Sequence, residues 1–235
     1  MAERGLCSRR EADRWILDER LCVNGVLALP GCKVSPEDKI ALDGKPIQVK
    51  IPSKVYWMLN KPDFTLVGLD PTGEKKSIFE LPKLRKIPFR FSSAGRLDFR
   101  TEGLLVLSND GGFLNKVSHP SSGVQKEYFA VVNRKLTDAE LSEMRSGVTL
   151  KDGLASCRIH LMHSRKLGAG SGAAYSVEVT EGRNRLVRRL FEHFSIRVVR
   201  LARIRIGQLE LPETLMPGEY CQLTSNQIAK LLQNR

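Results

Sequence analysis

The order of strand-like and helix-like stretches restricts this chain to few folds. Apolar runs with β-branched and aromatic residues recur along it, and only two single helices, over 137–147 and 184–194, separate them. The runs are VYWMLN (55–60), GLLVLS (103–108), KEYFAVV (126–132), CRIHLMH (157–163), AYSVEVT (174–180) and VVRLARIRI (198–206). Hairpins mixed with single helices predict an α+β domain with a mixed, largely antiparallel sheet and flanking helices, and they argue against a doubly wound fold.

The first 48 residues have the pattern of a separate small module. SRREADRWILDE (8–19) predicts a helix with a capping box, in which Ser8 is the N-cap and Glu11 follows three residues later. Short strand-like runs follow it, with tight-turn signals such as Asn24-Gly25 and Asp43-Gly44 between them. We therefore predict a helix-plus-hairpin module over 1–48, a linker over 49–54 and a larger catalytic domain over 55–235.

The charge balance indicates the class of partner. The chain has 38 Lys and Arg against 26 Asp and Glu, a formal net charge of +12. Such an excess favours a polyanionic partner, although a basic protein that is merely soluble or ribosome-associated would have the same balance. Five cysteines without C-x-x-C spacing predict neither a disulfide framework nor a zinc site, and no apolar run is long enough for a membrane span. We expect a soluble, intracellular protein.

Basic residues gather in three stretches of the sequence. Asn184 is the expected N-cap of the 184–194 helix, whose wheel puts Arg185, Arg188 and Arg189 opposite the apolar side chains. Arginines at a helix start can hold phosphates, and a solvated charged face is the alternative. Four arginines, Arg197, Arg200, Arg203 and Arg205, also lie among apolar residues of a strand-like run, where protection of an edge strand is the alternative. The candidate RNA-binding residues are Arg9, Arg10, Arg14, Arg183, Arg185 and Arg189.

One carboxylate stands out as a candidate for chemistry. In GRLDFRTEGLLVLSNDGG (95–112), Asp98 lies between Arg96 and Arg100, directly before a strand-like run. Neighbouring positive charges would keep this carboxylate ionised, so it could act as a nucleophile or as a base. A surface ion pair of little consequence is the alternative. The glycine-rich 168–177 stretch leads into a strand, so we interpret it as a hairpin loop and not as a dinucleotide site.

Several long motifs, in order, resemble those of the RsuA/RluB-type pseudouridine synthases, which isomerise uridines in ribosomal RNA. The 95–111 stretch resembles the family's catalytic motif, KEYFAVV its tyrosine strand, and EGRNRLVRRLFE (181–192) with VVRLARIRIG (198–207) its closing basic motifs. The first residues resemble the RNA-binding module shared with ribosomal protein S-four. LPKLRK (81–86) resembles the large-subunit RluB branch.

The resemblance implies a role for each matching residue. Asp98 would be the catalytic carboxylate, and Arg96 would help to displace and replace the target base. Tyr128 would stack on the flipped uracil, Arg188 would pair with Asp98, and Leu201 would form an apolar wall of the pocket. Leu186 stands where the family often has a Gln or Glu, so this position offers no polar contact.

We therefore expect an enzyme that isomerises a uridine of ribosomal RNA, in the large subunit, without a cofactor or a metal ion. Its partner would be ribosomal RNA or a ribosomal subunit precursor, and it would act as a cytoplasmic monomer that binds no membrane. Two other functions stay open. One is a non-catalytic RNA-binding protein with this fold, either a ribosome assembly factor or a ribosomal component. The other is an N-glycosidase that uses Glu102 as a second carboxylate to activate water.

Overall fold

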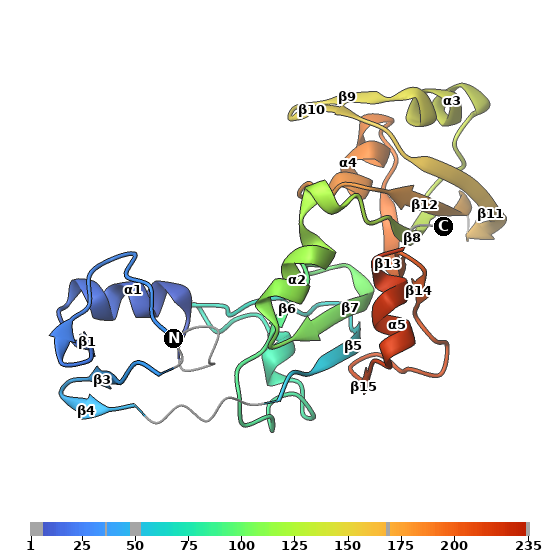
Figure 1. Ribbon diagram of the computed structural model, residues 1–235. Helices are drawn as coiled ribbons and strands as arrows, with labels where there is room; N and C mark the ends of the chain where they lie inside the picture. The colour runs from blue at the N-terminus through green and yellow to red at the C-terminus, as the bar shows by residue number, and fades with distance from the viewer. Residues whose placement is uncertain (1–6, 36, 48–52, 168–169, 234–235) are drawn as a thin grey trace. The chain divides into compact units, whose positions relative to one another are not determined.

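The computed structural model describes residues 7–35, 37–47, 53–167 and 170–233 (Figure 1). The chain divides into two compact units, one of residues 1–54 with 88–91 and one of residues 55–87 with 92–235. Most of the predicted linker, residues 49–52, lies outside the described residues, as do residues 168 and 169 of the glycine-rich stretch.

The first unit packs one helix on a small antiparallel sheet. Its helix α1 is Arg9–Leu17, and the strands β1 (Leu21–Val23), β2 (Val26–Leu27), β3 (Ile40–Leu42) and β4 (Lys45–Pro46) pair in the order β2-β1-β3-β4. The predicted capping box is confirmed, because Ser8 Oγ accepts from the Glu11 amide at 3.1 Å and the Glu11 carboxylate accepts from the Ser8 amide at 3.2 Å. Leu21, Ala28 and Ile40 form the buried core.

The described residues of the second unit form one long sheet, a separate two-stranded sheet, four α-helices and two short 3₁₀ helices. Its strands are β5 (Tyr56–Lys61), β6 (Ser92–Ser93), β7 (Glu102–Ser108), β8 (Lys126–Val132), β9 (Val148–Leu150), β10 (Gly153–Ala155), β11 (Arg158–Leu167), β12 (Gly170–Val179), β13 (Val198–Ile206), β14 (Leu209–Glu210) and β15 (Tyr220–Gln222). Its helices are η1 (Ile78–Glu80), α2 (Gly111–Ser118), η2 (Pro120–Ser122), α3 (Asp138–Ser146), α4 (Leu186–His193) and α5 (Ser225–Leu231).

The long sheet consists of two antiparallel halves joined by one parallel pair. Along the order β11-β12-β8-β13-β7-β5-β15, every neighbouring pair is antiparallel except β13 with β7. That pair is short, with Ala202 opposite Glu102 and Arg203 opposite Gly103. Helices α3 and α4 pack on the half that contains β8, β11 and β12, and α2 and α5 pack on the half that contains β5 and β7 (Figure 1). The predicted α+β class with a mixed, largely antiparallel sheet is confirmed.

Local signals predicted many elements correctly, but they missed helices α2 and α5 and placed the start of α4 wrongly. The capping box of Thr137 with Glu140 and the stop at Gly147 are present around α3. The predicted N-cap Asn184 is wrong. Helix α4 is preceded by Arg185, whose backbone is left-handed at φ +51° and whose side chain makes no cap hydrogen bond. Residues 183–185, directly before α4, line the cavity described next.

Candidate active site

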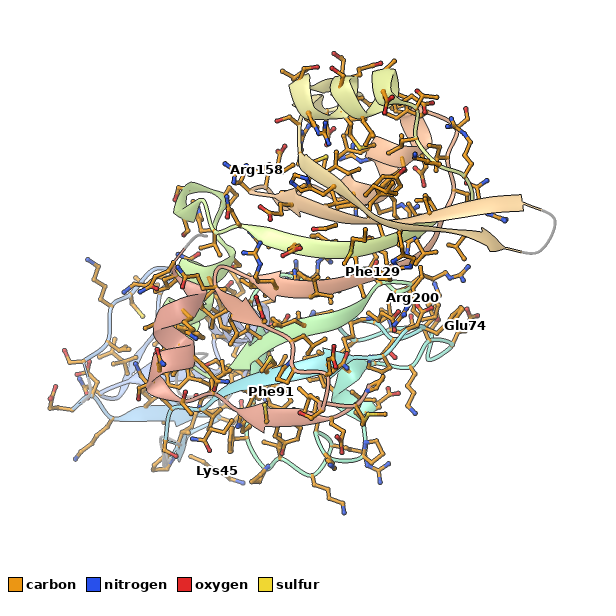
Figure 2. The ribbon with its side chains drawn as sticks, turned by 90° about the vertical axis from the view of Figure 1, so that its right-hand side faces the viewer. Lys45, Glu74, Phe91, Phe129, Arg158 and Arg200 are labelled. Carbon is orange, nitrogen blue, oxygen red and sulfur yellow. The ribbon has the colours of Figure 1, made fainter. Side chains whose placement is uncertain are left out.

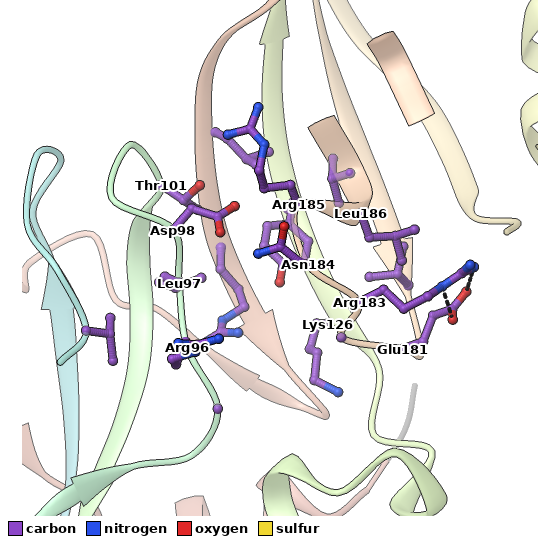
Figure 3. Close-up of a pocket in the computed structure, with 18 of the residues that line it drawn as sticks. Arg96, Leu97, Asp98, Thr101, Lys126, Glu181, Arg183, Asn184, Arg185 and Leu186 are labelled. Atoms are coloured by element: carbon purple, nitrogen blue, oxygen red, sulfur yellow. Dashed lines mark hydrogen bonds and ion pairs between the residues drawn. The ribbon is translucent and has the colours of Figure 1, made fainter. Parts of the chain in front are cut away.

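A cavity of about 450 Å³ lies where the two halves of the long sheet meet. Its walls come from the loop before β7, from β8, from β13 and from the segment before α4. Among the lining residues are Arg96, Leu97, Asp98, Lys126, Tyr128, Arg183, Asn184, Arg185, Leu201 and Arg203. Figure 3 shows Asp98 on one side of the cavity, with Asn184 and Arg185 on the segment opposite. The cavity therefore brings together residues from three distant parts of the sequence, namely Arg96 and Asp98, Tyr128, and Leu201.

Asp98 is held by its backbone and not by its side chain. Its carbonyl oxygen accepts from the Thr101 amide at 3.0 Å, and the preceding Leu97 is buried. Within the described part of the chain, the half-buried carboxylate makes no hydrogen bond or ion pair. Neither flanking arginine pairs with it, and the Arg100 guanidinium instead lies 4.8 Å from the centre of the Phe64 ring. The alternative of a surface ion pair is therefore wrong, and the carboxylate is free to meet a ligand.

Arg188 is hydrogen-bonded to the loop that carries Asp98. Arg188 is 8% exposed, and its guanidinium donates to the carbonyl oxygens of Val198, at 3.1 Å, and of Arg100. Burial lowers its pKa from the ordinary value, and the negative charge of Asp98 opposes this shift. Two expectations differ from the structure here. Arg188 is buried and does not lie on an exposed basic face. Its side-chain hydrogen bonds go to the backbone carbonyls of Arg100 and Val198 and not to the Asp98 carboxylate.

Two buried lysines at the site were not singled out from the sequence. Lys126 lines the cavity, is 9% exposed, and donates from Nζ to the Val124 carbonyl at 2.8 Å. Burial and the nearby Arg203 charge lower its pKa to about 8. Lys126 lies two residues before Tyr128 on one strand, so strand alternation could have placed both side chains on the same face.

Lys61 is fully buried behind the Asp98 loop. Its Nζ donates to the carbonyl oxygens of Thr101 at 2.7 Å and of Pro62 at 3.0 Å, with the Phe99 carbonyl at 3.5 Å. Burial lowers the pKa of Lys61 to about 8, and the charge of Asp63 opposes this shift. Nothing in the sequence identifies its acceptors, because two of them belong to residues about forty positions away. The ammonium group therefore fixes the turn that follows Asp98.

We expect the protein to become more stable between pH 8 and pH 10. The pKa of Lys61 is about 8 in the folded protein and near its ordinary value of 10.5 in the unfolded chain. Between these values the unfolded chain binds more protons, so the free energy of unfolding rises with pH, by about 2 kcal/mol for one such lysine. Urea unfolding at pH 7.5, 9 and 10 measures the rise. In Lys61→Met, the rise in unfolding free energy with pH should be smaller, with only the contribution of Lys126 left. Equal rises in the wild type and in Lys61→Met would contradict the role given to Lys61.

The basic segment at the start of α4 is linked to carboxylates of the same unit. Arg189 donates to both oxygens of Asp152, at 2.7 and 2.8 Å, and Arg183 pairs with Glu181 and Asp152. Figure 3 shows the pairing of Arg183 with Glu181 at the edge of the cavity. Arg185 pairs with Glu192 at 3.0 Å. RNA binding by these three residues stays a prediction, as it does for the exposed Arg9, Arg10 and Arg14 of α1.

The arginines of β13 do not protect an edge, because β13 lies in the middle of the sheet. Arg205 is buried and pairs with Glu127 at 2.7 Å and with Glu178 at 3.0 Å. Arg200 is exposed, pairs with Glu102, and has its guanidinium carbon 6.0 Å from the centre of the Phe129 ring. Figure 2 labels Arg200 and Phe129. The edge-strand interpretation is therefore wrong. Arg200 and Arg205 instead form ion pairs with carboxylates of other strands in the same sheet.

Two further properties of the described residues concern ligands and membranes. Among them, no group of three or more His, Cys, Asp or Glu side chains is arranged to hold a metal ion. Within the same ranges, no helix has the length and apolar character needed to cross a membrane.

Comparisons with known proteins identify chains of similar sequence. The model of the RNA pseudouridylate synthase family matches residues 55–193, and that of the S4 domain matches residues 1–40. An uncharacterized RNA pseudouridine synthase of Aquifex aeolicus is 39% identical over 98% of this chain and 91% of its own length. The ribosomal large subunit pseudouridine synthase B of Escherichia coli K12 is 37% identical over 95% of this chain and 77% of its own length.

A solved structure gives the same result for the fold. The crystal structure of a pseudouridylate synthase superimposes with a TM-score of 0.68 at 26% identity, covering 98% of this chain and 96% of that one. The sequence match and the fold match both include the strands that line the cavity. The chain therefore belongs to the RNA pseudouridylate synthase family, with an S4 domain at its N-terminal end.

Proposed function

We propose that this enzyme converts one uridine of large-subunit ribosomal RNA to pseudouridine, with Asp98 as its catalytic carboxylate. The observation that carries the proposal is the half-buried Asp98 side chain, which has no partner among the described residues and faces a cavity that Tyr128 and Leu201 also line. The choice of the large subunit follows the name of the Escherichia coli relative, which matches nearly the whole chain.

The cavity suits a uracil that has been turned out of the RNA stack. Enzymes that act on a base inside folded RNA extrude it and hold it against aromatic and apolar side chains. Tyr128 would stack on the ring and Leu201 would cover it, while Arg96 would fill the space that the base leaves. The reaction breaks the bond from the sugar to N1, turns the base and forms a bond to C5, and the proton on C5 leaves. Asp98 acts as nucleophile or base in this sequence.

The competing N-glycosidase function needs a second carboxylate to activate water. Glu102, the candidate from the sequence, does not line the cavity, and its carboxylate accepts from Arg200. The remaining lining carboxylate, Glu181, pairs with Arg183 at 2.8 Å. Isomerisation, in which the base is rejoined to the sugar, therefore fits the described residues better than hydrolysis.

The S4 domain supplies a second RNA contact in this proposal. Residues 1–48 would form the RNA-binding module and residues 55–235 the catalytic domain, with Arg9, Arg10 and Arg14 of α1 on the RNA-facing surface. All three arginines are exposed. We propose that the protein acts as a monomer in the cytoplasm.

Mapping of pseudouridines in ribosomal RNA, with and without the gene, tests the proposed function. We expect one large-subunit position to change from pseudouridine to uridine when the gene is removed, and to be restored by the wild-type gene. A loss confined to small-subunit RNA would overturn the choice of subunit. An unchanged map, together with no pseudouridine formed by the purified protein, would favour the non-catalytic assembly factor.

We expect Tyr128 to contribute through its aromatic face and not through its hydroxyl group. Tyr128→Phe keeps the face and should retain RNA affinity, whereas Tyr128→Ala should lose about 1–3 kcal/mol of stacking. Affinity for a ribosomal RNA fragment and the rate of pseudouridine formation measure the difference. Equal results for the two variants would place Tyr128 outside the base-binding site.

A further inference from the structure

An exposed aromatic side chain stands next to the candidate active site and has no part in the function proposed so far. Phe64 is 55% exposed and follows strand β5. Its ring meets that of Phe99 edge to face, with the centroids 5.7 Å apart, and Phe99 lines the cavity. The next residue, Thr65, donates from its amide to the Phe99 carbonyl at 3.2 Å. The Phe64 ring is therefore fixed to the loop that carries Asp98.

Two cations flank this pair of rings. The Arg100 guanidinium carbon lies 4.8 Å from the centre of the Phe64 ring, and Lys75 Nζ lies 5.7 Å from the centre of the Phe99 ring. Arg100 is exposed, and its guanidinium has no carboxylate partner within the ranges that the structure describes. A guanidinium held over an aromatic ring and free of an ion pair is suited to a phosphate group.

Phe64 has a left-handed backbone conformation, which is unfavourable for a bulky side chain. Its φ is +52°, the left-handed region, where glycine or asparagine is at ease and a phenylalanine is strained. The Asp63 carboxylate holds the conformation by accepting from the Phe64 amide at 2.9 Å. Because more than half of the Phe64 surface stays in water, burial offsets little of this cost. Strain at an exposed, bulky residue beside an active site indicates a role in binding.

We propose that Phe64 and Arg100 form a nucleotide platform, in which the base next to the target uridine stacks on Phe64 and its phosphate pairs with Arg100. This inference rests on the proposed function. When a uridine is turned out of an RNA strand, its neighbour loses a stacking partner on one side. An aromatic ring beside the cavity replaces that partner for any of the four bases. The two flanking cations favour an RNA strand over an apolar protein segment.

Binding of a short single-stranded oligouridylate to Phe64 variants tests the platform. Phe64→Asn suits the left-handed backbone and removes the ring, whereas Phe64→Tyr keeps the ring. We expect Phe64→Asn to weaken oligouridylate binding about tenfold, the effect of one lost stacked base, and Phe64→Tyr to bind like the wild type. Met216→Gln is the control, because Met216 is similarly exposed, at 59%, and does not line the cavity.

Kinetics and stability separate this role from a structural one. With total ribosomal RNA from cells that lack the gene, Phe64→Asn should raise KM about tenfold and leave kcat near the wild-type value, with an unchanged or higher melting temperature. If Phe64→Asn has a lower melting temperature but unchanged oligouridylate binding, Phe64 has a structural role and the platform is overturned. Wild-type affinity and KM in Phe64→Asn would also overturn the platform. If the wild type makes no pseudouridine, the proposed function fails, yet weaker oligouridylate binding by Phe64→Asn would still support the platform.

Discussion

Asp98→Asn is expected to abolish pseudouridine formation while the protein stays folded. The substitution keeps the shape of the side chain and removes its negative charge. Because the Asp98 carboxylate has no hydrogen bond or ion pair within the described residues, its loss leaves no partner unsatisfied. The rate should fall by at least about a thousandfold, since an amide can act neither as nucleophile nor as base. Pseudouridine quantified in RNA after incubation with the purified variant measures the loss.

Asp138→Asn is the matched control for this change. Asp138 is an exposed residue in the first turn of α3, does not line the cavity, and should tolerate the same substitution without effect on activity. RNA affinity of Asp98→Asn should equal or exceed that of the wild type, because a negative charge beside phosphate is removed. An Asp98→Asn enzyme with normal turnover would refute the assigned role, whatever its melting temperature.

Gly103→Ala is expected to have the largest effect on stability. Gly103 has φ +100° and faces β13 at the parallel pair that joins the two halves of the sheet. A methyl group there would overlap the carbonyl oxygen of Arg203 and lie 2.8 Å from its backbone nitrogen. Neither backbone can give way without separating β7 from β13. Together with the left-handed strain, the overlap should cost about 3–5 kcal/mol of unfolding free energy.

Gly111→Ala provides the comparison within the same unit. Gly111 is the first residue of α2, and an added methyl group would have no atom within 4 Å. Alanine should therefore be neutral or stabilise the helix by up to about 1 kcal/mol. Urea unfolding of the two variants gives the difference directly. Equal midpoints would mean that the sheet can widen between β7 and β13 at little cost.

The elements of the fold were largely predictable because each depends on short-range signals. The bounds of β8 and β13 coincide with the predicted strands, and the capping boxes of α1 and α3 are present. The start of α4 was predicted wrongly because Arg185, a residue without special preference for positive φ, turns the chain there in place of a side-chain cap at Asn184. Residue preferences therefore do not predict a left-handed turn at this arginine.

The sequence placed some residues of the cavity together, and it predicted their contacts less well. Arg96, Asp98, Tyr128 and Leu201 line one cavity, and the roles that the resemblance implies for them stay predictions. The hydrogen bonds of Arg188 could not be foreseen, because carbonyl oxygens are present at every residue and only the fold selects which ones a buried guanidinium meets. For the same reason the contacts of Lys61 could not be predicted, because two of its three acceptors, Phe99 and Thr101, lie on a different loop.

The single parallel pair between β7 and β13 also affects how the protein folds. The paired residues Glu102 and Ala202 are far apart in the chain, so this contact closes a long loop, whereas the hairpin of β11 with β12 closes a short one. Contacts of high sequence separation form late and slowly during folding. The hairpin of β11 with β12 can form first, and the cavity is completed only when β7 meets β13. In refolding experiments, secondary structure should therefore return before the ability to bind RNA in the cavity.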